Sequence, residues 1–217
     1  MNSVFLVAAI LYAVGFVPYM VAILRPEHRP ANFPSRLWSV VIWLAPTQGR
    51  PQKSSWIIYS SLDMVALASG IFLAHKGEAN PVNFQLITAA IGATTVMFIS
   101  FRRGVPGWTT LDKVVIAGAV VGAVVWYFRP DWSLYISLLL MTVGSYPTWK
   151  WAWSNSQDES KLGWTLFFLS CVVALFGVED WHDINVWLQP VVFLFIESVM
   201  MVIFYIVPVF RRTKEAA

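Results

Sequence analysis

Charged residues are scarce in this chain of 217 amino acids. Only 12% of the residues are Asp, Glu, Lys or Arg, whereas 58% are hydrophobic. A water-soluble domain of this size carries about 25% charged residues, because its surface must stay hydrated. There is too little polar material here to cover a surface in water. The sequence therefore predicts an integral membrane protein that has lipid as its solvent.

Alternating polarity is also missing. Outer-membrane β-strands alternate polar and apolar residues over about ten positions, whereas the apolar runs of this chain are nearly continuous and close to helical span length. The fold class is therefore predicted to be all-α, as one membrane domain. Seven segments are expected to be transmembrane helices: 3–24, 56–74, 82–101, 112–128, 132–149, 162–178 and 186–210.

Cysteine and catalytic motifs are nearly absent. Cys171 is the single cysteine, which excludes a disulfide within the chain. The sequence has no GxSxG nucleophile elbow, no HExxH helix and no phosphate-binding glycine loop. We therefore expect neither an enzyme nor a cofactor. The acidic segment 179–183 lacks a compact pair of His or Cys ligands, so no metal site is expected there.

Lysine and arginine are distributed unevenly among the loops. With seven spans, thirteen of the 15 basic residues fall on one side, and only Lys76 and Arg129 on the other. Basic loops stay in the cytoplasm, so we expect the N-terminus outside and the C-terminus in the cytoplasm, in the cell (inner) membrane. This orientation explains the net charge of +3 without a nucleic-acid partner. An eighth span at 37–45 would weaken the asymmetry, so that segment is expected to be interfacial or re-entrant.

Local signals mark the ends of several predicted spans. Ser160 or Asp158 is expected to cap the helix that follows it, and Asp112 to open another helix where the dipole favours a carboxylate. Tryptophans near the span ends are expected to form an aromatic belt at headgroup depth. This set comprises Trp56, Trp108, Trp126, Trp132, Trp181 and Trp187.

A glycine followed three residues later by a proline occurs in the first and the fifth predicted spans. GFVPYMVAILR contains Gly15 and Pro18, and GSYPTWKWAW contains Gly144 and Pro147. These helices correspond if the chain consists of three helices, a linker helix and three further helices. The predicted organisation is a first three-helix repeat at 1–101 with a cytoplasmic insertion at 26–49, a linker helix at 111–128 and a second three-helix repeat at 130–210.

These features resemble the PQ-loop superfamily, which includes the SWEET sugar facilitators and the PnuC-type vitamin-precursor channels. The chain is also similar to an uncharacterised group of small bacterial membrane proteins of that shape, at GFVPYMVAILR, at RPQKSSW (50–56) and at YPTWKWAWSNSQDES (146–160). The resemblance implies seven helices in a 3+1+3 pseudo-repeat and a transport function. It implies no sugar substrate, because Pro18 precedes Tyr19 and Pro147 precedes Thr148, where the superfamily has Pro-Gln.

Two acidic residues lie inside predicted spans, where an ionisable group costs at least about 2.5–3.5 kcal/mol. Glu197 is near the middle of 186–210, and Asp63 lies in 56–74 beside Ser60 and Ser61. Each is expected to face the bundle interior and to find a hydrogen-bond donor there. Each could serve as a proton-coupling or solute-binding carboxylate, or as a polar group that holds helices together.

Prolines and nearby aromatic residues are the remaining candidates. Pro18 and Pro147 each remove a backbone donor, so they could hinge a gate or simply kink their helices. Three aromatic residues lie within a turn of these prolines and could line a cavity or anchor in the interface: Tyr19, Tyr146 and Trp149.

Two functions are compatible with these patterns. The leading hypothesis is a transporter or facilitator of a small solute, with a pathway between the two three-helix repeats. The alternative is a non-transporting assembly or sensor protein that docks a partner or anionic lipid through the basic loop 25–53. In both hypotheses the lipid bilayer is a partner, and the protein could form a homo-oligomer. The sequence does not identify the solute of the first hypothesis.

Overall fold

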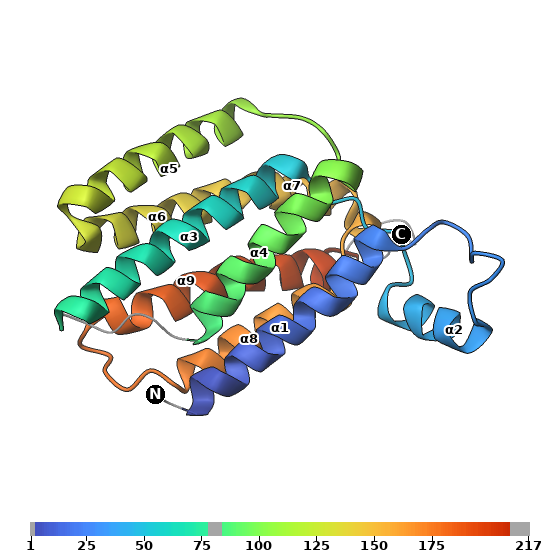
Figure 1. Ribbon diagram of the computed structural model, residues 1–217, viewed down its shortest axis with the longest axis horizontal. Helices are drawn as coiled ribbons and strands as arrows, with labels where there is room; N and C mark the ends of the chain where they lie inside the picture. The colour runs from blue at the N-terminus through green and yellow to red at the C-terminus, as the bar shows by residue number, and fades with distance from the viewer. Residues whose placement is uncertain (1–2, 78–83, 209–217) are drawn as a thin grey trace, which may run out of the picture.

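The computed structural model describes residues 3–77 and 84–208 (Figure 1). These residues are mainly helical, as the composition predicts. The helices in chain order are α1 (Ser3–Leu24), α2 (Ser35–Leu44), α3 (Lys53–Lys76), α4 (Phe84–Arg103), α5 (Thr110–Phe128), α6 (Pro130–Gly144), α7 (Tyr146–Ser154), the 3₁₀-helix η1 (Ser156–Asp158), α8 (Lys161–Leu175), α9 (Ile184–Met201) and the π-helix η2 (Val202–Ile206).

Five helical segments are long and apolar enough to cross a membrane. They are α1, α3, α4, α5 and the segment Ile184–Ile206, which consists of α9 and η2. They contain 19 to 24 residues. At about 1.5 Å per residue, each covers or nearly covers a hydrocarbon core of about 30 Å. Their length and composition indicate a membrane-embedded helical protein.

The other two predicted spans are shorter as helices. The segment 132–149 is divided into α6 and α7 at Ser145, and the segment 162–178 forms α8, which has 15 residues. The division has a physical cause, because Pro147 has no N–H to donate to the carbonyl of Val143 one turn earlier. Residues 82–83 and 209–210 of the predicted spans lie outside the described residues. Seven crossings therefore require α6 and α7 to act as one interrupted span and α8 to act as a short one.

Each half of the chain contains three packed helices in the same spatial order. In the first group α4 lies between α1 and α3, and in the second group α9 lies between α8 and the α6–α7 pair (Figure 1). The two groups meet reciprocally, because α1 packs against α8 and α3 packs against α6. The helix α5 packs on α3 and α6 at the edge of the bundle. It buries only four residues: Asp112, Val115, Ala119 and Gly122.

Two glycines lie at the reciprocal contacts between the groups. A Cβ at Gly15 would lie 2.7 Å from the ring of Phe167 in α8, and a Cβ at Gly144 would lie 2.8 Å from Ile58 in α3. Small residues allow membrane helices to approach closely. The repeated glycine–proline pattern therefore marks the first helix of each group where it meets the second helix of the other group.

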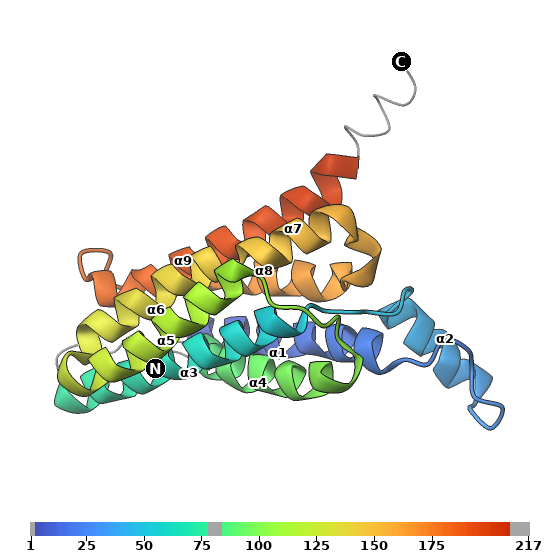
Figure 2. The same cartoon turned by 90° about the horizontal axis from the view of Figure 1, so that it is seen from above.

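The short helix α2 lies outside the bundle. It projects from the end of the bundle where α1 finishes, and none of its residues is buried (Figure 2). Leu37, Val40 and Trp43 are 55%, 51% and 73% exposed. A helix of 10 residues is about 15 Å long, half of a bilayer core. Its geometry fits the prediction that 37–45 is not a full span.

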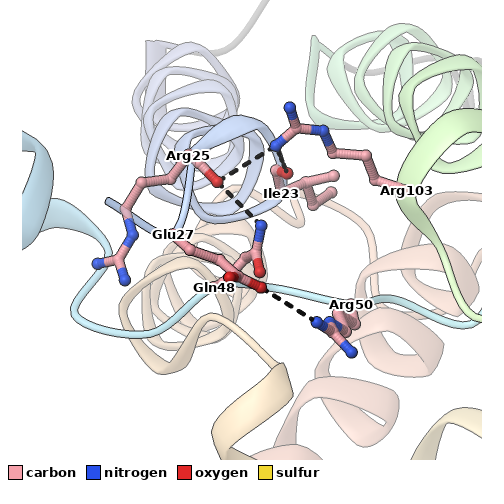
Figure 3. A network of polar contacts seen from close by, with 6 residues as sticks. All are labelled: Ile23, Arg25, Glu27, Gln48, Arg50 and Arg103. Atoms are coloured by element: carbon pink, nitrogen blue, oxygen red, sulfur yellow. Dashed lines mark hydrogen bonds and ion pairs between the residues drawn. The ribbon is translucent and has the colours of Figure 1, made fainter. Parts of the chain in front are cut away.

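The loop that carries α2 is tied to the bundle by arginines. Arg103 of α4 donates from Nη1 to the carbonyl of Ile23 at 3.4 Å and to that of Arg25 at 3.2 Å (Figure 3). The same atom lies 2.9 Å from the carbonyl oxygen of Leu24. A positive charge is favourable at this helix C-terminus because the last carbonyls carry partial negative charge. Farther along the loop, Arg50 lies 3.7 Å from the Glu27 carboxylate. The N–H of Gly49 donates to the carbonyl of Ala22 at 2.8 Å, so both ends of the insertion 26–49 lie beside the end of α1.

Candidate functional site

A small cavity lies between the two groups of three helices. Side chains from α1, α3 and α4 line it on one side and side chains from α6, α8 and α9 on the other. Its free volume is about 30 Å³, enough for roughly one or two water molecules. Most of the lining is aromatic. We call it the central cavity.

Asp63 and Glu197 both line the central cavity. Asp63 comes from α3 in the first group and Glu197 from α9 in the second, and each is 4% exposed. Oε1 of Glu197 accepts a long hydrogen bond of 3.5 Å from the hydroxyl of Tyr12. Oδ1 of Asp63 and Oε2 of Glu197 are buried without a hydrogen-bond partner among the described residues. Because a buried acceptor without a donor costs free energy, neither position is favourable for stability alone.

The polar surroundings differ from the prediction at Asp63, whereas Glu197 has the Tyr12 hydroxyl as a donor. The expected donor is missing at Oδ1 of Asp63. Ser60, one helical turn earlier, instead shares a hydrogen bond of 2.8 Å with Thr94 of α4. Residues three apart lie on the same face of a helix, but the Ser60 hydroxyl is already engaged by Thr94. The structure thus brings both predicted carboxyl groups together but leaves them with unused acceptors.

The three aromatic residues named beside the prolines do not line the central cavity: Tyr19, Tyr146 and Trp149. Tyr146 is 54% exposed, and Trp149 packs edge-on against Phe195 with ring centroids 6.0 Å apart. Tyr19 is buried on the same face of α1 as Tyr12 and Phe16, but one turn beyond the cavity. Tyr12 and Phe16 supply the aromatic lining from α1 instead.

The two prolines have different local structures. Pro18 lies inside the continuous helix α1, whereas Pro147 lies in the first turn of α7, directly after the division at Ser145. Both are buried. A helix interruption is therefore present at Pro147 and not at Pro18.

A further buried carboxyl group lies at the end of the bundle beside α2. Glu159 is 3% exposed, and its Oε2 accepts hydrogen bonds from the Tyr19 hydroxyl at 2.7 Å and from Trp164 Nε1 at 3.0 Å. Nε1 of Trp56 donates in turn to the Tyr19 hydroxyl at 3.2 Å. We call Tyr19, Trp56, Glu159 and Trp164 the Glu159 cluster. Trp56 and Trp164 also line the central cavity, so the cluster adjoins it.

Glu159 belongs to the loop between η1 and α8, outside the spanning helices. Burial raises the pKa of its carboxyl group to about 7, while the hydrogen bonds from Trp164 and Tyr19 lower this pKa and the neighbouring Asp158 raises it. The carboxyl group therefore changes charge near neutral pH.

A larger cavity of about 470 Å³ lies on the other side of Glu159. Its walls come from the end of α2 and the loop after it, from the start of α8, and from Tyr205 of η2. Trp43 in this wall is 73% exposed and Lys161 is also exposed, so the cavity opens to the outside of the protein. We call it the outer cavity.

Sequence reasoning missed Glu159 because the segment 154–160 has the composition of an ordinary polar loop. Its capping prediction is confirmed for Ser160, whose Oγ accepts a hydrogen bond from the N–H of Gly163 at 3.2 Å. The expected role of Asp112 is also confirmed, because it forms a capping box with Thr109. The partner that buries Glu159, Tyr19, precedes it by 140 positions, and no local pattern indicates such a contact.

The assignment of Trp56 to the aromatic belt is wrong. Trp56 is 4% exposed and donates to Tyr19. Trp108, Trp132 and Trp181 are 47%, 55% and 53% exposed, as belt residues would be. Trp56 differs because it lies in the first turn of α3, on the face that packs into the interface between the groups.

A fully paired polar cluster contrasts with the two cavity carboxyls. Nε2 of Gln85 in α4 donates to Oγ of Ser170 in α8 at 2.9 Å, and Ser170 donates to the carbonyl of Ala8 in α1 at 2.6 Å. Nε2 of Gln189 in α9 donates to Oε1 of Gln85 at 3.5 Å. These bonds join four helices, which is the expected pattern for polar groups that hold a membrane bundle together.

Comparison with protein families, with curated proteins and with solved structures finds no match to this chain. In the part of the chain that the structure describes, no group of three or more His, Cys, Asp and Glu side chains could hold a metal ion. In the acidic segment 179–183, Asp183 accepts a hydrogen bond from the N–H of Asn185 at 2.9 Å and so caps α9.

Proposed function

We propose that this protein is a seven-helix membrane transporter or facilitator of a small solute, with its pathway between two three-helix repeats. The observation that carries the proposal is that Asp63 and Glu197 line one cavity between the two groups and keep buried oxygens without donors. Gln85 and Ser170, which join α4 to α8, are by contrast paired with each other. Unused acceptors at a cavity between membrane helices are suited to bind a proton or a donor group of a solute.

The 3+1+3 organisation is supported by the reciprocal packing of the two groups. The helices at the cavity come from 1–101 and 130–210, whereas α5, within the linker 111–128, lies at the edge. Gly15 and Gly144 occupy matching contacts. This arrangement agrees with the resemblance to the PQ-loop superfamily. In the proposed architecture α6 and α7 form one interrupted crossing and α8 a short one.

The proposed orientation, with the N-terminus outside the cell membrane, is supported by the charges at the two ends of the bundle. The basic loops meet at one end, where the N–H of Arg50 donates to the carbonyl of Asp158 at 3.0 Å and that of Lys53 to the carbonyl of Val105 at 3.2 Å. Lys76 and Arg129 lie at the other end. Reporter fusions after positions 156 and 180 should therefore report the cytoplasm and the outside respectively, and the same side for both would refute this orientation.

Transport can be tested with purified protein in lipid vesicles. A trapped pH-sensitive dye would report proton flux while labelled sugars, amino acids and nucleosides are offered in turn. We expect flux above that of protein-free vesicles, reduced at least about tenfold by Asp63→Asn or Glu197→Gln. Asp180→Asn is the matched control, because Asp180 is exposed in a loop away from the cavity. Flux equal to that of protein-free vesicles for all these solutes would contradict the proposal.

The alternative function, docking through the basic loop 25–53, is favoured by one observation. The helix α2 exposes apolar side chains beside the exposed Arg29 and Arg36, a pattern suited to the surface of an anionic membrane. Two other arginines of the loop are engaged internally, since Arg25 donates to the carbonyl of Ala45 at 2.6 Å and Arg50 lies beside Glu27. If docking is the function, Arg29→Ala with Arg36→Ala should abolish retention of anionic lipid during purification and leave flux unchanged.

A further inference from the structure

Glu159 separates the two cavities. On one side it lines the outer cavity. On the other side its Oε2 is bound by Tyr19 and Trp164, and Trp164 lines the central cavity. Trp56, which donates to Tyr19, lines the central cavity as well. A solute or proton that moves between the outer cavity and the carboxyl groups of Asp63 and Glu197 would therefore have to pass the Glu159 cluster.

We propose that Glu159 is a proton-binding site that gates this passage, closed when its carboxyl group holds a proton and open when the proton is released. The inference rests on the proposed function, because it names the gate of the same pathway. It adds a third proton-binding group to the two cavity carboxyls and places this group next to solvent.

The direction of the effect follows from burial. In the closed form the side chain is 3% exposed, and an ionised carboxylate there loses most of its hydration. Opening would admit water from the outer cavity and stabilise the charge. The closed form therefore binds the proton more tightly than the open form, so a rise in pH must favour opening. Because burial raises the pKa of Glu159 to about 7 in the closed form, the change should occur near neutral pH.

Other ionisable groups face Glu159 from each neighbouring element. Tyr19 of α1 and Tyr59 of α3 lie on the cavity side, and Asp158 of η1 precedes it. Lys161 of α8 and Tyr205 of η2 line the outer cavity with it. Asp158 opposes ionisation by its negative charge. Among the described residues, no cation forms an ion pair with Glu159, so after the proton is released only the hydrogen bonds from Tyr19 and Trp164 and water from the outer cavity stabilise the charge.

Access to the central cavity can be measured with a cysteine placed inside it. Ala93 lines the cavity, and Cys171 is the single native thiol, so the parent chain for this test carries Ala93→Cys and Cys171→Ser. A membrane-impermeant methanethiosulfonate would be applied to inverted vesicles, with the outer-cavity end facing the reagent. The rate is divided by that of Ser35→Cys in the Cys171→Ser chain, because Ser35 is exposed on α2, which removes the ordinary dependence of thiol reactivity on pH.

We expect the normalised rate to rise at least about fivefold between about pH 6 and about pH 8. Glu159→Gln cannot release a proton and should hold the rate at its low value throughout. Glu197→Gln, which should lose proton flux, should keep the rise. A rise of the same size in Glu159→Gln would overturn the proposal. Because labelling requires no transported solute, this result is independent of whether transport is found.

A second variant keeps the proposal testable if Glu159→Gln does not fold. Tyr19→Phe removes a hydrogen bond that lowers the pKa of Glu159, so the midpoint of the labelling curve should move to higher pH by about one unit. An unchanged midpoint, or one moved to lower pH, would refute the role of Glu159.

Discussion

The hydroxyl of Tyr19 lies 2.7 Å from Oε2 of Glu159, although 140 positions separate the two residues in the chain. The contact joins α1, the first helix of one group, to the loop that precedes α8, the second helix of the other group. Trp56 and Trp164 extend it to the wall of the central cavity. One hydrogen-bonded cluster therefore crosses the interface between the groups at the end where the basic loops meet.

Glu159→Gln should change how stability depends on pH. The pKa of Glu159 is raised by burial to about 7 in the folded protein and lies near about 4.3 in an unfolded chain. Between these two pH values the folded state holds a proton that the unfolded state releases, so the free energy of unfolding falls by up to about 4 kcal/mol as pH rises. Glutamine does not titrate. The variant should therefore gain stability relative to the parent from about pH 4.5 to about pH 7 in detergent unfolding, whereas a constant difference would argue against the buried carboxyl.

Asp63→Asn should not reduce stability. Oδ1 of Asp63 lacks a donor, so an isosteric neutral amide removes an unfavourable buried acid at no loss of a hydrogen bond. Gln85→Ala is the comparison, because it breaks bonds to Ser170 and Gln189 and should cost about 1–3 kcal/mol. Thermal unfolding in detergent would measure both variants. If Asp63→Asn lowered the midpoint as much as Gln85→Ala, Asp63 would have a structural role.

Gly15→Ala should weaken the contact between the two groups. The new Cβ would meet the ring of Phe167 at 2.7 Å, and displacing that ring should cost about 1–3 kcal/mol. Gly144→Ala should behave similarly against Ile58. Gly122→Ala is the matched control, since its Cβ would lie 3.6 Å from Ile136, an ordinary contact, and alanine favours helix by about 1 kcal/mol. Equal thermal midpoints for the Gly15 and Gly122 variants would contradict close packing at Gly15.

Pro147→Ala should join α6 and α7 into one helix. Alanine restores the N–H that can donate to the carbonyl of Val143, so amide hydrogen exchange should slow at positions 145–149. If the division is a hinge of the transport cycle, solute flux should fall as well. Pro18→Ala should have a smaller effect, because α1 is already continuous through Pro18. Unchanged exchange after Pro147→Ala would show that the division has another cause.

Most of the helical segments were predictable from sequence because apolar length is a local property. The predicted segment 3–24 has the same bounds as α1, and 112–128 begins two residues after α5 does. The division at Ser145 was harder to predict from sequence, since membrane helices often continue through a proline, as α1 does at Pro18. The interior position of Asp63 and Glu197 followed from the cost of a carboxyl group in lipid.

The sequence by itself determined that the apolar segments lie in lipid, that they are helical, and that basic residues cluster in particular loops. Each of these properties depends only on the composition of successive segments. Only the tertiary structure decided that Asp63 and Glu197 share a cavity, and that Glu159 is buried by Tyr19 and Trp164. Those contacts form between helices distant in the chain, and their geometry is set by which faces pack together. The amino-acid order near any one of these residues does not specify that choice.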